Sequence, residues 1–172
     1  KMIDSNDIAQ GDGPMAPTRC GALPVKDVVK MCYSGKFTER QMYDKITKTG
    51  GLVDHLGTSD AREVCKMIDE GSQYAKLIYD AMIYQIAKQA GAMAAALEGD
   101  VDGIILTGGI SYDKYVDAEL TRKLKFIAPV TVMAGEFEME ALAAGAIRVL
   151  SGEEQPKEYT GIPCWNGFDF DK

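Results

Sequence analysis

The sequence predicts an α/β fold in which helices cover a parallel sheet. Two apolar stretches predict the strands, residues 101–106 and 127–133, and the core of the first, Ile104-Ile105-Leu106, carries no charge. A polar, helix-forming segment at 113–125 separates the two stretches. Uncharged strands flanked by helices are typical of a parallel sheet that is covered on both faces.

The remaining helices follow from apolar spacing and from capping residues. A helix is expected at 25–33, and a Thr38–Gln41 capping box predicts a second that ends near residue 47. Residues 52–59, with the single histidine His55, are expected to form a loop. Asp60, with Glu63 at capping distance, predicts a helix start. The longest helix is expected at 72–97, with its tyrosines and methionines in the core, and a last one is expected to end near residue 150.

Composition excludes several classes of protein. The chain has 172 residues and a net charge of −7 without a basic run, which argues against binding to nucleic acid or to an anionic membrane surface. The alanine-rich stretch 90–97 is too short to span a bilayer. Four cysteines without a Cys-x-x-Cys pair argue against a zinc site or a disulfide framework and favour reduced thiols in a cytoplasmic protein.

The two ends carry further expectations. The first nine residues lack a signal-peptide pattern and are expected to be the end of a strand, as in a fragment of a longer chain. Trp165 and Phe168 are expected to hold the polar tail against the body.

The turn after the first strand, Gly108-Gly109-Ile110-Ser111-Tyr112-Asp113, is a candidate ligand site. Ligands of parallel sheets bind where the strands end, and glycines let a flat ring or a phosphate approach the backbone. Asp113 can cap the helix that follows. A tight strand-to-helix turn without a ligand fits the same residues.

Other polar residues each allow a functional and a structural interpretation. Arg19, in a Gly/Pro-rich loop, could clamp an anion or be solvated. Asp60 and Arg62 lie at a helix start, where a ligand could bind, although Asp60 could simply be an N-cap. Glu136, Glu138 and Glu140 could face a Mg²⁺–phosphate site or only suit a helix dipole. His55 is expected to be structural or to lie near a ligand.

Four motifs in order resemble one family, the acetate and butyrate kinases of the sugar kinase, Hsp70 and actin superfamily. The motifs are Gly11-Asp12-Gly13-Pro14 with Pro17-Thr18-Arg19-Cys20-Gly21, then Ser59-Asp60-Ala61-Arg62, then Leu106-Thr107-Gly108-Gly109-Ile110-Ser111-Tyr112-Asp113, and last Gly135-Glu136-Phe137-Glu138-Met139-Glu140-Ala141-Leu142. Their order and spacing agree with the carboxyl-terminal half of such proteins over nearly the whole chain. The resemblance implies that residues 1–172 form a single carboxyl-terminal nucleotide-binding domain without the amino-terminal one.

The resemblance implies a ribonuclease H-like domain, with helices on a mixed sheet, and the transfer of phosphate from ATP to a short-chain carboxylate. The implied nucleotide site is Asp60, Ala61, Arg62, Gly108, Gly109, Ile110 and Asp113. The implied catalytic residue is Arg19, and the Mg²⁺-associated residue is Glu138, with Glu136 or Glu140 as alternatives. A homodimer is implied as well, and the acyl pocket is expected mostly in the absent half.

Two departures from the family pattern limit the resemblance. The expected phosphate loops, Asn-x-Gly-Ser-x-Ser and His-Leu-Gly-Gly-Gly, do not occur in these 172 residues. Ser111-Tyr112-Asp113 replaces the Gly-Glu-Asn that is typical of acetate kinases, which favours the butyrate branch. A non-catalytic nucleotide-binding or interaction module therefore stays an alternative. A dinucleotide-binding dehydrogenase domain is disfavoured, because Gly-x-Gly-x-x-Gly is missing after a strand.

Overall fold

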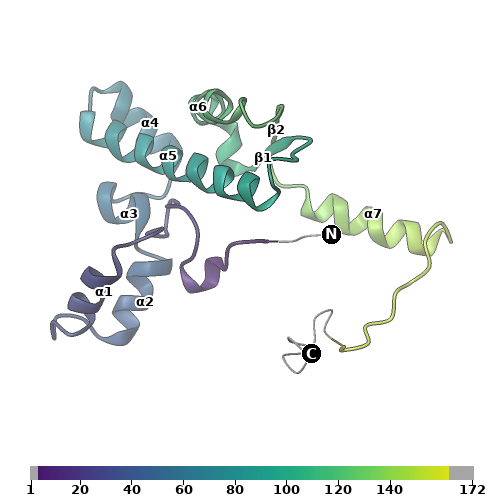
Figure 1. Ribbon diagram of the computed structural model, residues 1–172, viewed down its shortest axis with the longest axis horizontal. Helices are drawn as coiled ribbons and strands as arrows, with labels where there is room; N and C mark the ends of the chain where they lie inside the picture. The colour runs from purple at the N-terminus through teal and green to yellow at the C-terminus, as the bar shows by residue number, and fades with distance from the viewer. Residues whose placement is uncertain (1–3, 163–172) are drawn as a thin grey trace. The chain divides into compact units, whose positions relative to one another are not determined.

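The computed structural model describes residues 4–162 and has the predicted α/β architecture (Figure 1). Its contacts divide the chain after Gly135 into two compact units, and α7 belongs to the second unit. The elements in chain order are η1 (Ile8–Gln10), α1 (Val25–Cys32), α2 (Glu39–Thr47), α3 (Gly51–Leu56), α4 (Ala61–Asp69), α5 (Gln73–Ala96), β1 (Ile104–Gly108), η2 (Gly109–Tyr112), α6 (Lys114–Leu124), β2 (Val130–Ala134) and α7 (Glu138–Leu150).

The two strands pair in parallel, as predicted, with Ile104 opposite Val130 and Gly108 opposite Ala134. Both strands begin about three residues later than the sequence suggested. Pro129 lies just before β2 because it has no N–H group to donate within the sheet. Its carbonyl oxygen still accepts a hydrogen bond from the Ile104 N–H at 2.9 Å. Further strands of the expected mixed sheet do not occur within residues 4–162.

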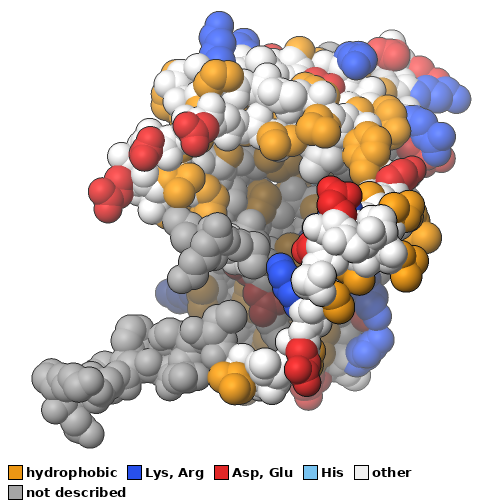
Figure 2. All heavy atoms as spheres, turned by 90° about the vertical axis from the view of Figure 1, so that its right-hand side faces the viewer, with side chains coloured by type: hydrophobic (Ala, Val, Ile, Leu, Met, Phe, Trp, Pro, Cys, Tyr) orange, Lys and Arg blue, Asp and Glu red, His pale blue; other side chains and the backbone are white. Residues whose placement is uncertain are grey.

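The described helices bury one face of the sheet. Ile104, Leu106 and Val130 pack against the hydrophobic core, which is formed mainly by α4, α5 and α6. Its buried members are Met15, Leu52, Val64, Ile78, Tyr79, Met82, Ile83, Val116, Leu120 and Leu124. Within the first unit, the helices cover only this face: Ile105 points the opposite way and is 64% exposed. Figure 2 shows hydrophobic side chains open at the surface on one side of the molecule.

Most helix starts follow from the capping residues. Thr38 forms the predicted capping box with Gln41, while Asp60, Ser72 and Asp113 each accept a backbone N–H at the head of their helices. The expected capping role of Glu63 is wrong, because its carboxylate instead accepts a hydrogen bond from the Thr58 hydroxyl. The side chain of Asp60 therefore caps α4 without that partner.

The predicted loop at 52–59 is mostly a helix, α3, and only residues 57–59 are irregular. Gly51 opens α3 with φ +59. A Cβ atom added there would lie 1.8 Å from the Ala16 carbonyl oxygen, so a long-range packing contact requires the glycine. Such a contact leaves no signal in the local sequence.

The beginning of the chain differs from expectation too. Residues 4–7 form no strand, and Asp7 caps the short η1 helix. Trp165 and Phe168 lie outside the described residues, as does Cys164. None of the helices in the described part of the chain has the length and hydropathy needed to cross a membrane.

Candidate functional site

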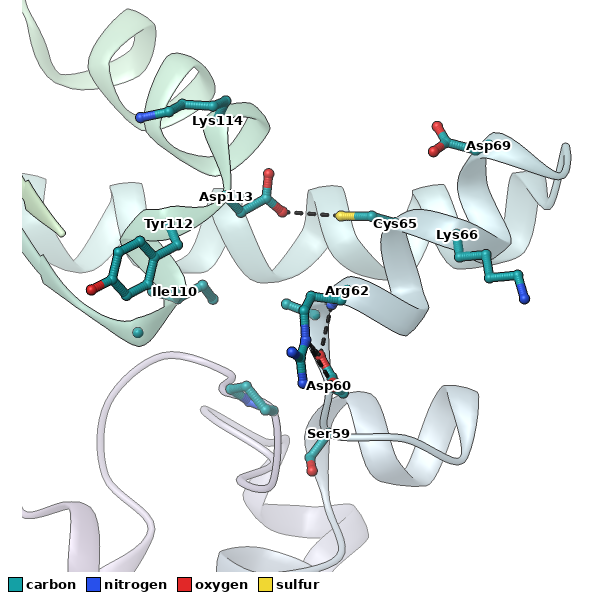
Figure 3. Close-up of a pocket in the computed structure, with 13 residues that line it drawn as sticks. Ser59, Asp60, Arg62, Cys65, Lys66, Asp69, Ile110, Tyr112, Asp113 and Lys114 are labelled. Carbon is teal, nitrogen blue, oxygen red and sulfur yellow. Dashed lines mark hydrogen bonds and ion pairs between the residues drawn. The ribbon is translucent and has the colours of Figure 1, made fainter. Parts of the chain in front are cut away.

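A cavity of about 910 Å³ lies between the start of α4 and the turn that follows β1 (Figure 3). The α4 side supplies Ser59, Asp60, Ala61, Arg62, Cys65, Lys66 and Asp69. The opposite side supplies Gly109, Ile110, Tyr112, Asp113 and Lys114, and Pro17 completes the lining. Two segments about 50 residues apart in sequence thus meet at the carboxyl end of β1. The structure brings together all the predicted nucleotide-site residues except Gly108, which directly precedes the lining.

Asp60 and Arg62 form a close ion pair at the edge of this cavity. The Arg62 guanidinium donates hydrogen bonds to the Asp60 carboxylate at 2.6–3.1 Å, and the Arg62 N–H donates to it at 2.9 Å. The Arg62 side chain lowers the pKa of Asp60, and the backbone N–H adds to that effect. Since the Arg62 side chain is 90% exposed, its remaining N–H groups are free to meet an anionic or planar ligand.

Asp113 lines the cavity while its carboxylate binds three protein groups. Oδ1 accepts the Tyr115 N–H at 2.8 Å, which caps α6. Oδ2 accepts the Tyr79 hydroxyl at 2.6 Å and the Cys65 thiol at 3.1 Å. Burial by itself would raise the pKa of Asp113, but these hydrogen bonds outweigh it and the pKa lies below its usual value.

Gly108 and Gly109 are glycines for different reasons. Gly108 has φ +85 and ψ 177, a backbone conformation that is open almost exclusively to glycine. Gly109 has an ordinary φ, and a Cβ atom added there would meet nothing within 4 Å. Because that open space belongs to the cavity, a side chain at position 109 would occupy room for a ligand and leave the fold unstrained.

Arg19 lies on a loop whose backbone is fixed at several points. The Pro17 carbonyl accepts the Val53 N–H at 3.1 Å, the Thr18 carbonyl accepts the Gly50 N–H at 3.0 Å, and the Cys20 N–H donates to the Ile46 carbonyl at 3.1 Å. The segment before Arg19 is tied to α5 by the Met15 N–H, which donates to Gln85 Oε1 at 3.0 Å. Another tie joins Asn6 and Gln89 at 2.8 Å.

A smaller cavity of about 260 Å³ adjoins the first at this loop. Apolar side chains dominate its lining, which also includes Arg19 and Asp12. The apolar members are Ile8, Pro14, Met15, Ala16, Pro17, Met82, Ile86 and Ile110. Pro17 and Ile110 line both cavities. Arg19 therefore lies among apolar residues at a cavity that adjoins the larger one.

The three glutamates belong to the second unit. Glu138 is the first residue of α7, Glu140 lies in its first turn, and the side chains of Glu136, Glu138 and Glu140 are exposed. Within residues 4–162 no group of three or more His, Cys, Asp or Glu side chains could hold a metal ion by itself. A single carboxylate that shares Mg²⁺ with phosphate oxygens fits these residue types.

Sequence reasoning missed two residues that bind Asp113: Cys65, which lines the cavity, and Tyr79, which does not. Both were assigned only to helices, and Tyr79 was correctly expected in the core. A buried tyrosine hydroxyl needs a hydrogen-bond partner, and that requirement was the available signal. His55 does not line the cavity, and its Nδ1 lies 3.0 Å from the Tyr74 hydroxyl.

Known proteins resemble the chain in sequence and in fold. The family model for the acetokinase family matches residues 7–146. A probable butyrate kinase 2 from Caldanaerobacter subterraneus is 54% identical over 159 residues, and butyrate kinase 2 from Clostridium acetobutylicum is 49% identical over the same length. These matches cover 92% of this chain and 45% of each relative, so the chain spans about half the length of the curated relatives it matches.

Solved structures agree on the fold. The crystal structure of Porphyromonas gingivalis acetate kinase superposes with a TM-score of 0.73 at 23% identity, covering 81% of this chain and 41% of that one. Acetate kinase from Entamoeba histolytica gives 0.67 at 20% identity, covering 79% of this chain and 43% of that one. The α/β fold predicted from the sequence is therefore confirmed, and the chain belongs to the acetokinase family.

Proposed function

We propose that this chain is the nucleotide-binding part of an ATP-dependent short-chain carboxylate kinase, with butyrate as the acceptor. One observation carries the proposal: Asp60, Ala61 and Arg62 face Gly109, Ile110 and Asp113 across a cavity large enough for a nucleoside. Family membership and relatives named butyrate kinase support a carboxylate as the acceptor.

In the proposed reaction the carboxylate oxygen attacks the γ-phosphorus of ATP, and ADP leaves. Arg19 is the proposed catalytic residue, since its guanidinium can neutralise charge on the phosphoryl group during in-line transfer. The cavity beside Arg19 suits the acceptor side of the site, because it is mainly apolar and adjoins the nucleotide cavity. Glu138 is the proposed Mg²⁺-associated residue, with Glu136 and Glu140 as alternatives.

The substitution Gly109→Val tests the nucleotide site. Its methyl groups would project into the cavity, so we expect ATP affinity to fall about tenfold or more while the melting temperature changes little. Isothermal titration calorimetry on the complete gene product measures the affinity. Gly91→Ala is the matched control, because Gly91 also has free space around its Cβ position but lies in α5, outside the cavity. Equal ATP affinities for wild type and a folded Gly109→Val protein would exclude this site.

A non-catalytic nucleotide-binding module of the same fold is the second candidate. Both candidates predict ATP binding, and a coupled assay with ATP and butyrate separates them. Formation of butyryl phosphate by the complete gene product supports the kinase, whereas nucleotide binding without turnover supports the module.

A further inference from the structure

The walls of the nucleotide cavity are joined by one buried hydrogen-bonded cluster, Tyr79–Asp113–Cys65. Tyr79 comes from α5 and is fully buried, Cys65 comes from α4, and Asp113 ends the turn after β1. The Tyr79 hydroxyl and the Cys65 thiol donate to the same oxygen, Oδ2 of Asp113. In Figure 3 Cys65 and Asp113 point toward one another between α4 and the start of α6.

We propose that Tyr79 is a positioning residue of the nucleotide site, which acts through Asp113 to fix the distance between the two cavity walls. The inference rests on the proposed function, because it assigns a task within that same site. Tyr79 does not line the cavity, so it has no direct contact with a ligand there. Its influence on binding must pass through Asp113 and the turn Gly109–Tyr112.

The chemistry of the cluster favours a fixed geometry. Burial raises the pKa of Tyr79, and Asp113 raises it further, so the phenol stays protonated and donates its hydrogen bond. Burial and the hydrogen bond to Asp113 raise the pKa of Cys65 to about 11, so the thiol also stays a donor at neutral pH. Two permanent donors on one carboxylate oxygen hold the Asp113 side chain in a single orientation.

The neighbouring Tyr115 provides a matched control. Its ring stacks on that of Tyr79, with ring centroids 6.4 Å apart and an angle of 18° between the rings. Its hydroxyl also donates to a carboxylate at 2.6 Å, but the acceptor is Asp80, which does not line the cavity. Tyr79→Phe and Tyr115→Phe therefore each remove one hydroxyl that donates to a carboxylate, and only the Tyr79 hydroxyl donates to Asp113. Tyr115 meets Asp113 through its backbone N–H, which the substitution leaves in place.

The test compares ATP affinity by calorimetry and melting temperature for the complete gene product and its variants. We expect Tyr79→Phe to weaken ATP binding about five- to tenfold, since a hydrogen bond to a charged group is lost beside the site. Tyr115→Phe should leave ATP affinity unchanged. A solely structural role for the Tyr79 hydroxyl would lower the melting temperature without lowering the affinity of the folded protein, and that result would overturn the proposal.

A double-mutant cycle gives a second readout. Asp113→Ala removes the acceptor, so adding Tyr79→Phe to it should weaken ATP binding no further, because residues in one hydrogen-bond network are not additive. Fully additive losses would overturn the proposal even if Tyr79→Phe alone proved unstable. If wild type binds ATP and both tyrosine variants bind equally well, this inference fails and the proposed function stands. If wild type does not bind ATP, the proposed function itself fails.

Discussion

The proposed role of Arg19 depends on the planar shape of its guanidinium group. A guanidinium can donate two parallel hydrogen bonds to phosphate oxygens, whereas a lysine ammonium acts as a point charge. Backbone hydrogen bonds on both sides of Arg19 hold the loop in place, so the side chain starts from a fixed position.

We therefore expect Arg19→Lys to lower kcat by about a hundredfold or more while the KM for ATP changes less than about threefold. Steady-state kinetics on the complete gene product measures both. Arg40→Lys is the control, since Arg40 is an exposed residue of α2 that pairs with Asp44 away from both cavities. An unchanged kcat for Arg19→Lys would identify Arg19 as a solvated loop residue.

Asp117 is a buried carboxylate without a hydrogen-bond partner in the described structure, and it is only 7% exposed. Burial raises its pKa above the usual value. The folded state therefore keeps this proton more strongly than the unfolded state does. Stability from this group is fully present below the ordinary carboxyl pKa and is lost as the pH rises through the raised value.

Replacing Asp117 with Asn should raise the free energy of unfolding at pH 7 by about 1–3 kcal/mol and weaken the loss of stability with rising pH. Thermal unfolding from about pH 3, below the ordinary Asp pKa of about 3.9, to about pH 8 checks this. Glu119→Gln, also on α6, should do the opposite, because Arg122 lowers the pKa of Glu119 and the pair contributes stability at neutral pH. A drop in stability at pH 7 for Asp117→Asn would contradict the assignment.

At the scale of elements, α3 offers a comparison within a single helix. Gly51 at its start and Gly57 at its end both have positive φ, but only Gly51 has neighbours that a Cβ atom would strike. Those neighbours are the Ala16 and Arg19 carbonyl oxygens, at 1.8 and 2.7 Å. A side chain at Gly51 would thus push the Arg19 loop away from α3.

Gly57→Ala should cost only backbone strain, about 1–2 kcal/mol of unfolding free energy. Gly51→Ala should cost about 1–3 kcal/mol more through overpacking, and it should lower kcat without weakening ATP binding. Chemical denaturation and kinetics on the two variants measure these effects. Equal effects of the two substitutions on both stability and kcat would show that the loop is not held by α3.

The sequence predicted these elements wherever the cause was local. Thr38, Asp60, Ser72 and Asp113 cap helices through hydrogen bonds that span two or three residues. The sequence predicted the caps at Thr38, Asp60 and Asp113, whereas it predicted Ser72 only as the first residue of its helix. The helix α3 was missed because the glycine at its start is required by close packing against the Ala16 carbonyl oxygen, 35 positions away in sequence. The Tyr79–Asp113 bond spans 34 positions and was missed for the same reason. The nucleotide-site residues came from the family resemblance, since a Gly-Gly turn alone left a ligand-free turn open.

At the scale of the whole molecule, the chain spans 45% of the relatives it matches. The phosphate loops implied by the family resemblance are missing from these 172 residues. Phosphoryl transfer depends on holding the γ-phosphate in line with the acceptor, and such positioning is worth roughly 7–11 kcal/mol of barrier. We propose that the missing loops supply it.

We expect these 172 residues alone to bind ATP weakly and to show no measurable butyrate kinase activity in a hydroxamate assay. The complete gene product is the positive control, and turnover by the 172 residues within about a hundredfold of it would show that the positioning groups lie in this chain.

Light scattering on the same samples tests the expected two-fold homodimer. A monomer at micromolar concentration would contradict that expectation.

The ties between the Arg19 segment and α5 have a consequence for folding. The bond from Met15 to Gln85 joins residues 70 positions apart, and that from Asn6 to Gln89 joins residues 83 apart. By contrast, β1, α6 and β2 follow one another directly, so one wall of the proposed nucleotide cavity can form from neighbouring sequence. Contacts across long loops incur their entropy cost before they gain any stability. The wall after β1 should therefore assemble early, and the arginine should be placed among the last steps. Local unfolding of the native protein should therefore release Arg19 first. As the protein is destabilised, catalytic activity should be lost before nucleotide binding.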